Sequence, residues 1–189
     1  MYGALCATVS RYISLVTTFI ALLRAVNVGG TGKLAMAELR SMCSKLGFTD
    51  VATYIQSGNV VFTTKISASK AQATLEAALT KHLGKPSAVI LRTRDELIAT
   101  ERANPFPAVA PSQLLVLFLD EAPPKSSLVH VKIPGREQLA CVGREVFIHF
   151  PDGMGRSKLK LPFANAGTGR NLNTLRKLIE MAGPKISKE

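Results

Sequence analysis

The alternation of apolar and polar residues divides the first half of the chain into regular elements. The apolar run 19–28, FIALLRAVNV, has the length and composition of a strand and ends at two glycines. The segment 34–47, LAMAELRSMCSKLG, carries apolar residues at helical spacing and ends in glycine. In 51–64, VATYIQSGNVVFTT, the triplet Ser-Gly-Asn separates two short β-rich runs, which predicts a tight antiparallel hairpin.

Two further elements complete a first structural unit. The segment 67–84, SASKAQATLEAALTKHLG, predicts a helix with Ser67 or Ser69 as N-cap and Gly84 as its end. The segment 87–93, SAVILRT, follows as a strand. This order is the ferredoxin-like or split βαβ plan, a four-stranded antiparallel sheet with both helices on one face. Both alternating sets of residues in the first strand are apolar, so we expect the sheet to be covered on its second face as well.

The second half has a similar but less regular pattern. Its expected elements are a helix in 94–106 up to the break at Pro105, a strand in 113–120, a segment 121–131 that could hold a short helix, a hairpin in 137–150, a basic glycine-containing loop in 151–159 and a final helix in 169–183. We therefore predict an α+β protein of two ferredoxin-like (α-β plait) subdomains packed together, with antiparallel sheets. The expected boundaries are an N-terminal extension outside the fold in 1–15, a first subdomain in 16–97 and a second in 98–189.

Composition narrows the range of partners. The chain of 189 residues is 47% hydrophobic, which is enough to bury a core. Its formal net charge of +11 favours an anionic partner such as a phosphorylated small molecule or a nucleic acid. The N-terminal 23 residues contain one charge, Arg11, but their interspersed serines and threonines argue against a membrane span, and no basic region begins a signal peptide.

Cysteine and histidine spacing indicates neither a metal site nor a cofactor. The three cysteines, Cys6, Cys43 and Cys141, are widely separated, and the three histidines are scattered. The spacing therefore supports no zinc site and no Ser/His/Asp triad. The odd cysteine count fits a reducing compartment, so we expect a soluble cytoplasmic protein with no membrane contact.

The glycines in 27–35, NVGGTGKLA, could hold a phosphate. A Walker A loop is not present, because Asn27 replaces its first glycine and Leu34 its final hydroxyl residue. The segment 30–35 matches G-x-G-x-x-A, but Asp50, twenty residues on, precedes the second strand instead of ending it, which argues against dinucleotide binding. Two interpretations of this glycine segment are left: the N-terminus of the following helix binds an anion, or the glycines only form a tight turn. The same two interpretations apply to the glycines of 167–171.

Several long motifs resemble one known family. They are ALLRAVNVGG at 21–30, Lys33, MAELR at 36–40, LGFTDVATYIQSGNVVF at 46–62, ANPFP at 103–107, VGREVFIHFPDGMGRSKL at 142–159 and GRNLNTLRKL at 169–178. In this order they resemble the bacterial family called domain of unknown function 1697, over about residues 17–182. The resemblance implies two α-β plait subdomains and no established activity.

The resemblance also draws attention to recurring polar positions. These are Arg24, Asn27, Gly29, Gly30, Gln56, Ser57, Gly58, Asn59, Asp152, Gly153, Gly155, Arg156, Ser157, Lys158, Arg170, Asn171, Asn173 and Thr174. A structural alternative exists for several: Gly58 and Asn59 can serve the turn, and Asn171 can cap the last helix. The chain departs from the family in its N-terminal extension, in a shortened stretch KLPFANAG where a longer helix is usual, and at Leu172, where an aromatic is typical.

Three functions remain open. The first is binding of an anionic ligand, a phosphate-containing small molecule or a nucleic-acid backbone, in a basic cleft between the subdomains. Its candidate cations are Arg24, Lys33, Arg156, Lys158 and Arg170. Base stacking is not indicated, because the third strand holds one aromatic residue, Phe62, and the chain contains no tryptophan.

The second is a small-molecule enzyme. In this hypothesis Asp152 acts as acid or base beside Arg156, Ser157 and Lys158, and Gln56 and Asn59 orient the substrate. The alternative for this loop is an exposed turn without chemistry. The third is a structural or oligomer-forming module that pairs through exposed strand edges.

Overall fold

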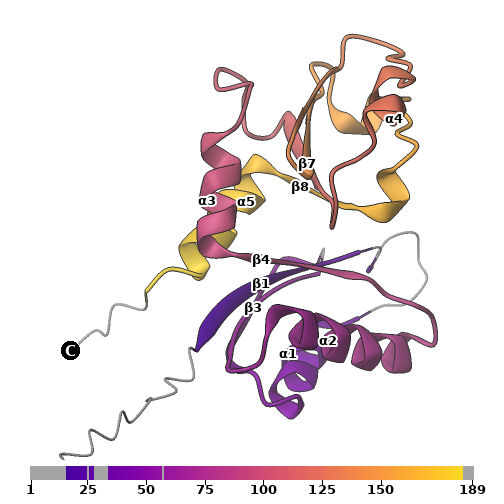
Figure 1. Ribbon diagram of the computed structural model, residues 1–189. Helices are drawn as coiled ribbons and strands as arrows, with labels where there is room; N and C mark the ends of the chain where they lie inside the picture. Colours follow the sequence, from indigo (N-terminus) through magenta and orange to yellow (C-terminus); the bar gives the residue numbers. More distant parts are fainter. Residues whose placement is uncertain (1–15, 25, 28–33, 57, 185–189) are drawn as a thin grey trace, which may run out of the picture.

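The computed structural model describes residues 16–24, 26–27, 34–56 and 58–184, and it contains two four-stranded antiparallel sheets (Figure 1). The first has the strand order β2-β3-β1-β4 and carries two helices. Its elements are β1 (Thr17–Leu23), α1 (Met36–Lys45), β2 (Thr49–Tyr54), β3 (Asn59–Thr64), α2 (Ala68–Leu83) and β4 (Val89–Thr93). This is the ferredoxin-like order expected from the sequence.

The second sheet repeats the same strand order, β6-β7-β5-β8. Its elements are α3 (Arg94–Arg102), β5 (Leu114–Phe118), α4 (Lys125–Val129), β6 (Gln138–Val142), β7 (Glu145–His149), the 3-10 turns η1 (Met154–Arg156) and η2 (Ala164–Ala166), β8 (Thr168–Asn171) and α5 (Leu172–Met181). The two ferredoxin-like subdomains are thus confirmed. Helix α3 crosses the boundary expected at 97/98, so the chain passes between the halves within a helix.

One predicted element is wrong at its start. The sequence predicts the final helix from residue 169, but Thr168–Asn171 form the edge strand β8, in which Arg170 pairs with Val116 and Gly169 with Leu117. Four residues with one glycine and three polar side chains carry no period-two pattern, so only the pairing with strand β5 identifies them as a strand. Helix α5 then begins at Leu172, with Asn171 as its N-cap.

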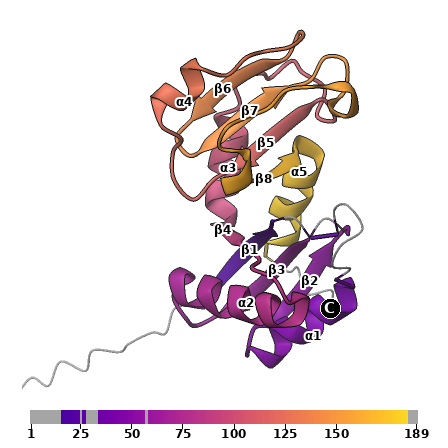
Figure 2. The same ribbon diagram turned by 90° about the vertical axis from the view of Figure 1, so that its right-hand side faces the viewer.

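The first sheet is buried on both faces, as the apolar pattern of its first strand predicts. Phe19, Ala21 and Leu23 point to the core formed with α1 and α2. Ile20 and Leu22 point the other way, into a core shared with α3, α5 and the second sheet. Figure 2 shows α3 and α5 lying between the two sheets.

The outer face of the second sheet is covered by a loop segment with two 3-10 turns instead of by a regular helix. Leu117, Leu119, Val146, Ile148 and Phe150 form its buried cluster. Here the connection from β7 to β8 contains η1 and η2, and its residues Leu159, Leu161 and Phe163 pack over the cluster. This segment contains the stretch KLPFANAG, where the resemblance described above implies a longer helix.

A buried arginine on β4 ties the halves together. Arg92 is 1% exposed, and its Nη2 donates to Leu119 O at 2.6 Å and to Glu145 Oε1 at 3.0 Å. Burial lowers the pKa of Arg92, and the nearby Arg144 lowers it further. Removing Glu145 would take away the carboxylate to which Arg92 donates, whereas removing Arg92 would leave Glu145 with Arg144, whose Nε lies 3.8 Å from Glu145 Oε1.

Within the part of the chain that the structure describes, no helix has both the length and the apolar composition needed to cross a membrane. In the same residues, no group of three or more His, Cys, Asp or Glu side chains is placed to hold a metal ion.

The two described cysteines differ in burial. Cys43 lies in the core of the first subdomain, where burial raises the pKa of its thiol to about 12, whereas Cys141 is exposed. We expect iodoacetamide at about pH 8 to alkylate Cys141 in the native protein and to leave Cys43 unmodified, because the thiolate is the reactive form. Peptide mass mapping before and after unfolding measures this. Equal labelling of the two cysteines in the native protein would contradict it.

Candidate functional site: a buried polar joint and a cationic pocket

The predicted site residues fall into two separate places, of which the first is a joint between the sheets. Arg170 on β8 is 6% exposed and reaches the ends of β1 and β3. The acceptors of its guanidinium include Asn59 Oδ1, Thr168 Oγ1 at 2.7 Å, Gly169 O at 2.8 Å, Leu23 O at 3.0 Å and Gly58 O at 3.1 Å. Thr168 Oγ1 also donates to Leu23 O, at 3.1 Å.

The hydrogen bonds of Arg170 give it a structural role within the protein. A guanidinium has five N–H groups, and these acceptors are enough to occupy all of them. Burial lowers the pKa of Arg170 to about 10, so the side chain stays charged at neutral pH, and it is stabilised by carbonyl, hydroxyl and amide oxygens. The sequence places Arg170 among the ligand-binding cations; the structure instead uses its donors to hold the two sheets together.

Asn27 has a structural role as well. Its Nδ2 donates to Leu34 O at 3.0 Å and to Gln56 O at 2.8 Å, and its Oδ1 accepts from Leu34 N at 2.8 Å. The residue has a left-handed backbone, with φ 59°, which asparagine tolerates better than most residues. Asn27 therefore ties the β2 to β3 hairpin to the segment before α1. Gln56 contributes its backbone carbonyl to this contact, and its side chain is exposed.

The other predicted site residues near the joint are Arg24, Asn171 and Asn173. Arg24 donates from Nη1 to Asn165 O. Asn171 caps α5, accepting from Thr174 N at 2.9 Å, which confirms the capping alternative. Asn173 is exposed in the first turn of α5. Gly29, Gly30, Lys33 and Ser57 lie outside the described residues.

The backbone of the β2 to β3 hairpin passes so close to β1 that residue 58 has to be glycine. Gly58 has φ 75°, and a Cβ there would lie 2.8 Å from Val26 Cγ2 and 2.9 Å from Leu23 Cβ. Both the backbone conformation and the missing side chain are needed, so the interpretation of Gly58 as a turn residue is confirmed.

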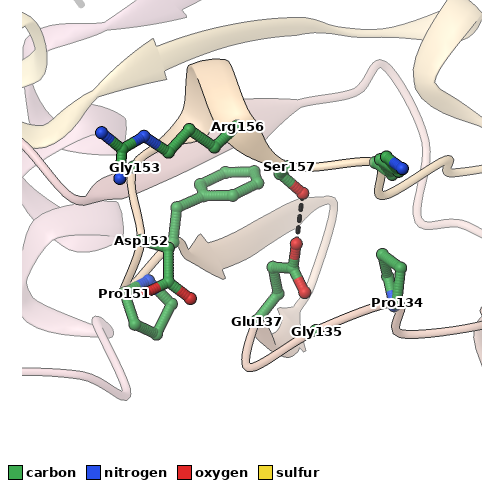
Figure 3. Close-up of a pocket in the computed structure, with 10 residues that line it drawn as sticks. Pro134, Gly135, Glu137, Pro151, Asp152, Gly153, Arg156 and Ser157 are labelled. Atoms are coloured by element: carbon green, nitrogen blue, oxygen red, sulfur yellow. Dashed lines mark hydrogen bonds between the residues drawn. The ribbon is translucent and has the colours of Figure 1, made fainter.

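The second place is a pocket at one end of the second sheet, with a volume of about 280 Å³. Its lining residues are Pro134, Gly135, Glu137, Phe150, Pro151, Asp152, Gly153, Arg156, Ser157 and Lys158 (Figure 3). Gln138 pairs with His149 at this end of the β6 to β7 hairpin, so the segments before β6 and after β7 leave the sheet together. Gly153, with φ 85°, then turns the chain into η1.

The two carboxylates of the pocket are already bonded within the protein. Asp152 accepts from Arg136 Nε at 3.2 Å and also from Nη2, and these bonds lower the pKa of Asp152. Glu137 accepts from the Ser157 hydroxyl, which lowers the pKa of Glu137. Both groups are therefore ionised at neutral pH, and Asp152 is a poor proton donor there.

The two cations of the pocket are differently placed. Arg156 and Lys158 are exposed, and neither side chain has a hydrogen bond or ion pair with another residue of the described ranges. Figure 3 shows Arg156 beside the pocket, on the turn that leads to Ser157. These two side chains can therefore take an anionic group without breaking an existing contact.

The sequence-based prediction misses Arg136 and Glu137. They lie outside any motif, in the segment before β6, and only the hairpin register brings them to residues 150–157. The signal that could have found them is the hairpin turn: counting outward from the pair Val142 and Glu145 brings Glu137 opposite Phe150 and Arg136 opposite Pro151.

The structure separates residues that the sequence-based prediction groups in one site. The sequence predicts one cleft between the subdomains, with residues from both ends of the chain. In the described residues, the pocket with Arg156 and Lys158 is lined entirely by the second half, whereas Arg170 and Asn59 are buried in the joint.

Comparisons with known proteins agree with this fold. No curated protein matches the chain. Among solved structures, the conserved bacterial protein SP0830 from Streptococcus pneumoniae is similar, with 26% sequence identity and a TM-score of 0.74, over 89% of this chain and 100% of that chain. Residues 16–147 match the family described as "Protein of unknown function (DUF1697)". Since more than half of its length lies inside that match, the chain belongs to the DUF1697 family.

Proposed function

We propose that this protein binds a phosphate-containing small molecule at the pocket of the second subdomain. The observation that carries the proposal is the contrast between the charged groups there: Asp152 and Glu137 are bonded within the protein, whereas the side chains of Arg156 and Lys158 have no such contacts. Two cations at the rim of one pocket can neutralise a phosphate dianion and donate several hydrogen bonds to it.

The shape of the pocket favours a small molecule over a nucleic acid. A volume of about 280 Å³ is near the lower end of the range for ligand pockets. The aromatic residue in its lining, Phe150, is 6% exposed, so its ring offers little surface on which a base could stack. A nucleic-acid backbone is the alternative, and it predicts affinity that falls steeply with salt.

We also infer a cytoplasmic location. The odd number and wide spacing of the cysteines support it, together with the free thiols of Cys43 and Cys141.

We expect Arg156→Ala and Lys158→Ala each to weaken binding of pyrophosphate by about tenfold, since each removes a charge-assisted hydrogen bond to the ligand. Isothermal titration calorimetry measures the dissociation constant of each variant. Lys70→Ala, which removes an exposed cation on α2, serves as the matched control and should bind as the wild type does.

Two outcomes would count against this assignment. If pyrophosphate, nucleoside monophosphates and sugar phosphates all fail to bind the wild type, the pocket has no phosphate ligand. If Lys70→Ala weakens binding as much as Arg156→Ala, the attraction comes from the overall charge of the protein and not from this pocket.

A further inference from the structure

The hydroxyl of Ser157 is held by two hydrogen bonds inside the pocket. Its Oγ donates to Glu137 Oε1 (Figure 3). The same oxygen accepts from the Leu159 backbone N–H at 3.1 Å. A hydroxyl oxygen has two lone pairs, so one remains available for attack on a bound group. The proton of Ser157 already points at a carboxylate that can take it.

Glu137 is itself positioned by its surroundings. A Cβ at Gly135 would lie 3.0 Å from Glu137 Oε2, so the absent side chain at 135 makes room for the carboxylate. Glu137 Oε2 is shielded from solvent and has no hydrogen-bond partner among the described residues. Serine and carboxylate thus form a fixed pair of proton donor and acceptor.

The basicity of the carboxylate selects the class of reaction. Acyl transfer to serine uses a base with a pKa near the working pH, as histidine has, and a glutamate carboxylate is ordinarily more acidic than that. Phosphoryl transfer needs an acceptor for the hydroxyl proton, but a weakly basic one is sufficient: a carboxylate accepts this proton in protein kinases. The charge that must be stabilised lies on the phosphoryl oxygens, and Arg156 and Lys158 flank Ser157 in the chain.

We propose that Ser157 accepts a phosphoryl group from a small acyl phosphate bound at this pocket. The Oγ to phosphorus bond forms as the bond between phosphorus and the leaving carboxylate oxygen breaks. The leaving group departs with the electron pair as a free carboxylate, and the Ser157 proton passes to Glu137 Oε1. Arg156 and Lys158 neutralise the transferred group. The inference rests on the proposed phosphate binding at the same pocket.

The test is incubation of the full chain with acetyl phosphate, followed by intact-mass measurement and peptide mapping. The expected result is one added phosphoryl group, located on Ser157. Ser157→Ala should abolish that product, and Glu137→Gln should slow its formation by about a hundredfold, because the amide cannot accept the proton. Ser126→Ala, at an exposed serine in α4, is the matched control and should be labelled as the wild type is.

The failures of the two proposals are distinguishable. If the wild type binds pyrophosphate by calorimetry but gains no phosphoryl group on Ser157, phosphoryl transfer is overturned and phosphate binding stands. If neither binding nor labelling occurs, both are overturned. Equal labelling of Ser157 in the wild type and in Glu137→Gln would also overturn the transfer step, whereas a folded Ser157→Ala that still binds pyrophosphate and stays unlabelled supports it.

Discussion

Replacement of Arg170 by methionine is expected to lower the free energy of unfolding by about 3–5 kcal/mol, because five hydrogen bonds from one buried guanidinium are lost and each contributes on the order of 1 kcal/mol. Methionine is similar in length but donates nothing, so Leu23 O, Gly58 O and Asn59 Oδ1 would each lose a hydrogen bond in the interior. Leu23 O and Gly58 O would keep their bonds from Thr168 Oγ1 and Leu23 N–H, so the loss comes from the missing guanidinium donors and not from fully unpaired acceptors. Equilibrium urea unfolding, followed by circular dichroism, measures the change.

The geometry of the joint also predicts the order of two variants. Arg170→Lys keeps the charge but replaces a planar fork of five donors by a single ammonium, so it should fall between the wild type and Arg170→Met. Arg176→Met is the matched control: Arg176 lies on α5, is half exposed and pairs with Glu101, so its loss should cost at most about 1 kcal/mol. Equal stability of Arg170→Met and Arg176→Met would show that the buried network does not stabilise the fold.

Gly167→Ala is expected to destabilise the protein by about 3 kcal/mol, the upper end of the range for overpacking. Gly167 has φ −119°, which any residue can adopt, so backbone conformation is not the reason. A Cβ there would lie 2.5 Å from Phe118 O, and the side chains of Leu119 and Leu117 would be 2.8 Å and 2.9 Å away. Since the nearest atom is backbone, relief requires a shift of β8 relative to β5. The melting temperature from differential scanning calorimetry measures the effect.

Gly155→Ala provides the control for that substitution. Gly155 lies in η1, and a Cβ at this residue would have no atom within 4 Å, so alanine should change the stability by less than about 0.5 kcal/mol. If Gly167→Ala melts at the same temperature as Gly155→Ala, the strands adjust more easily than the close contact implies.

The sequence predicts a helix or strand correctly where the apolar residues of that segment recur at the spacing of the element. The first subdomain can be predicted because its helices have apolar residues at helical spacing and end at glycines such as Gly84, which has a left-handed φ of 67°. Its strands are recognisable because they are runs of aliphatic residues between turns. Edge strand β8 has no such pattern, and its pairing with β5 depends on residues fifty or more positions earlier in the chain.

In the candidate site, too, some residues could be predicted from the sequence and others could not. Arg156, Ser157 and Lys158 are identifiable in the sequence and do line a pocket. Arg170 is predicted as a ligand-binding cation, and the structure buries it among acceptors of the protein; in the sequence, an arginine between a glycine and an asparagine looks the same whether it is buried or exposed. The partner of Ser157 is not identifiable, because Glu137 is twenty positions away and meets it only through the register of a hairpin.

The sequence by itself determined the order of the strands and helices of the first subdomain, the hairpins of both halves and the coverage of the first sheet on two faces, since each follows from contacts between near neighbours or from the apolar faces they create. Only the tertiary structure decided which polar residues are buried in the joint and which remain available in the pocket. That choice depends on contacts between residues far apart in the chain, and the cost of burying a charge is known only when its partners are in place.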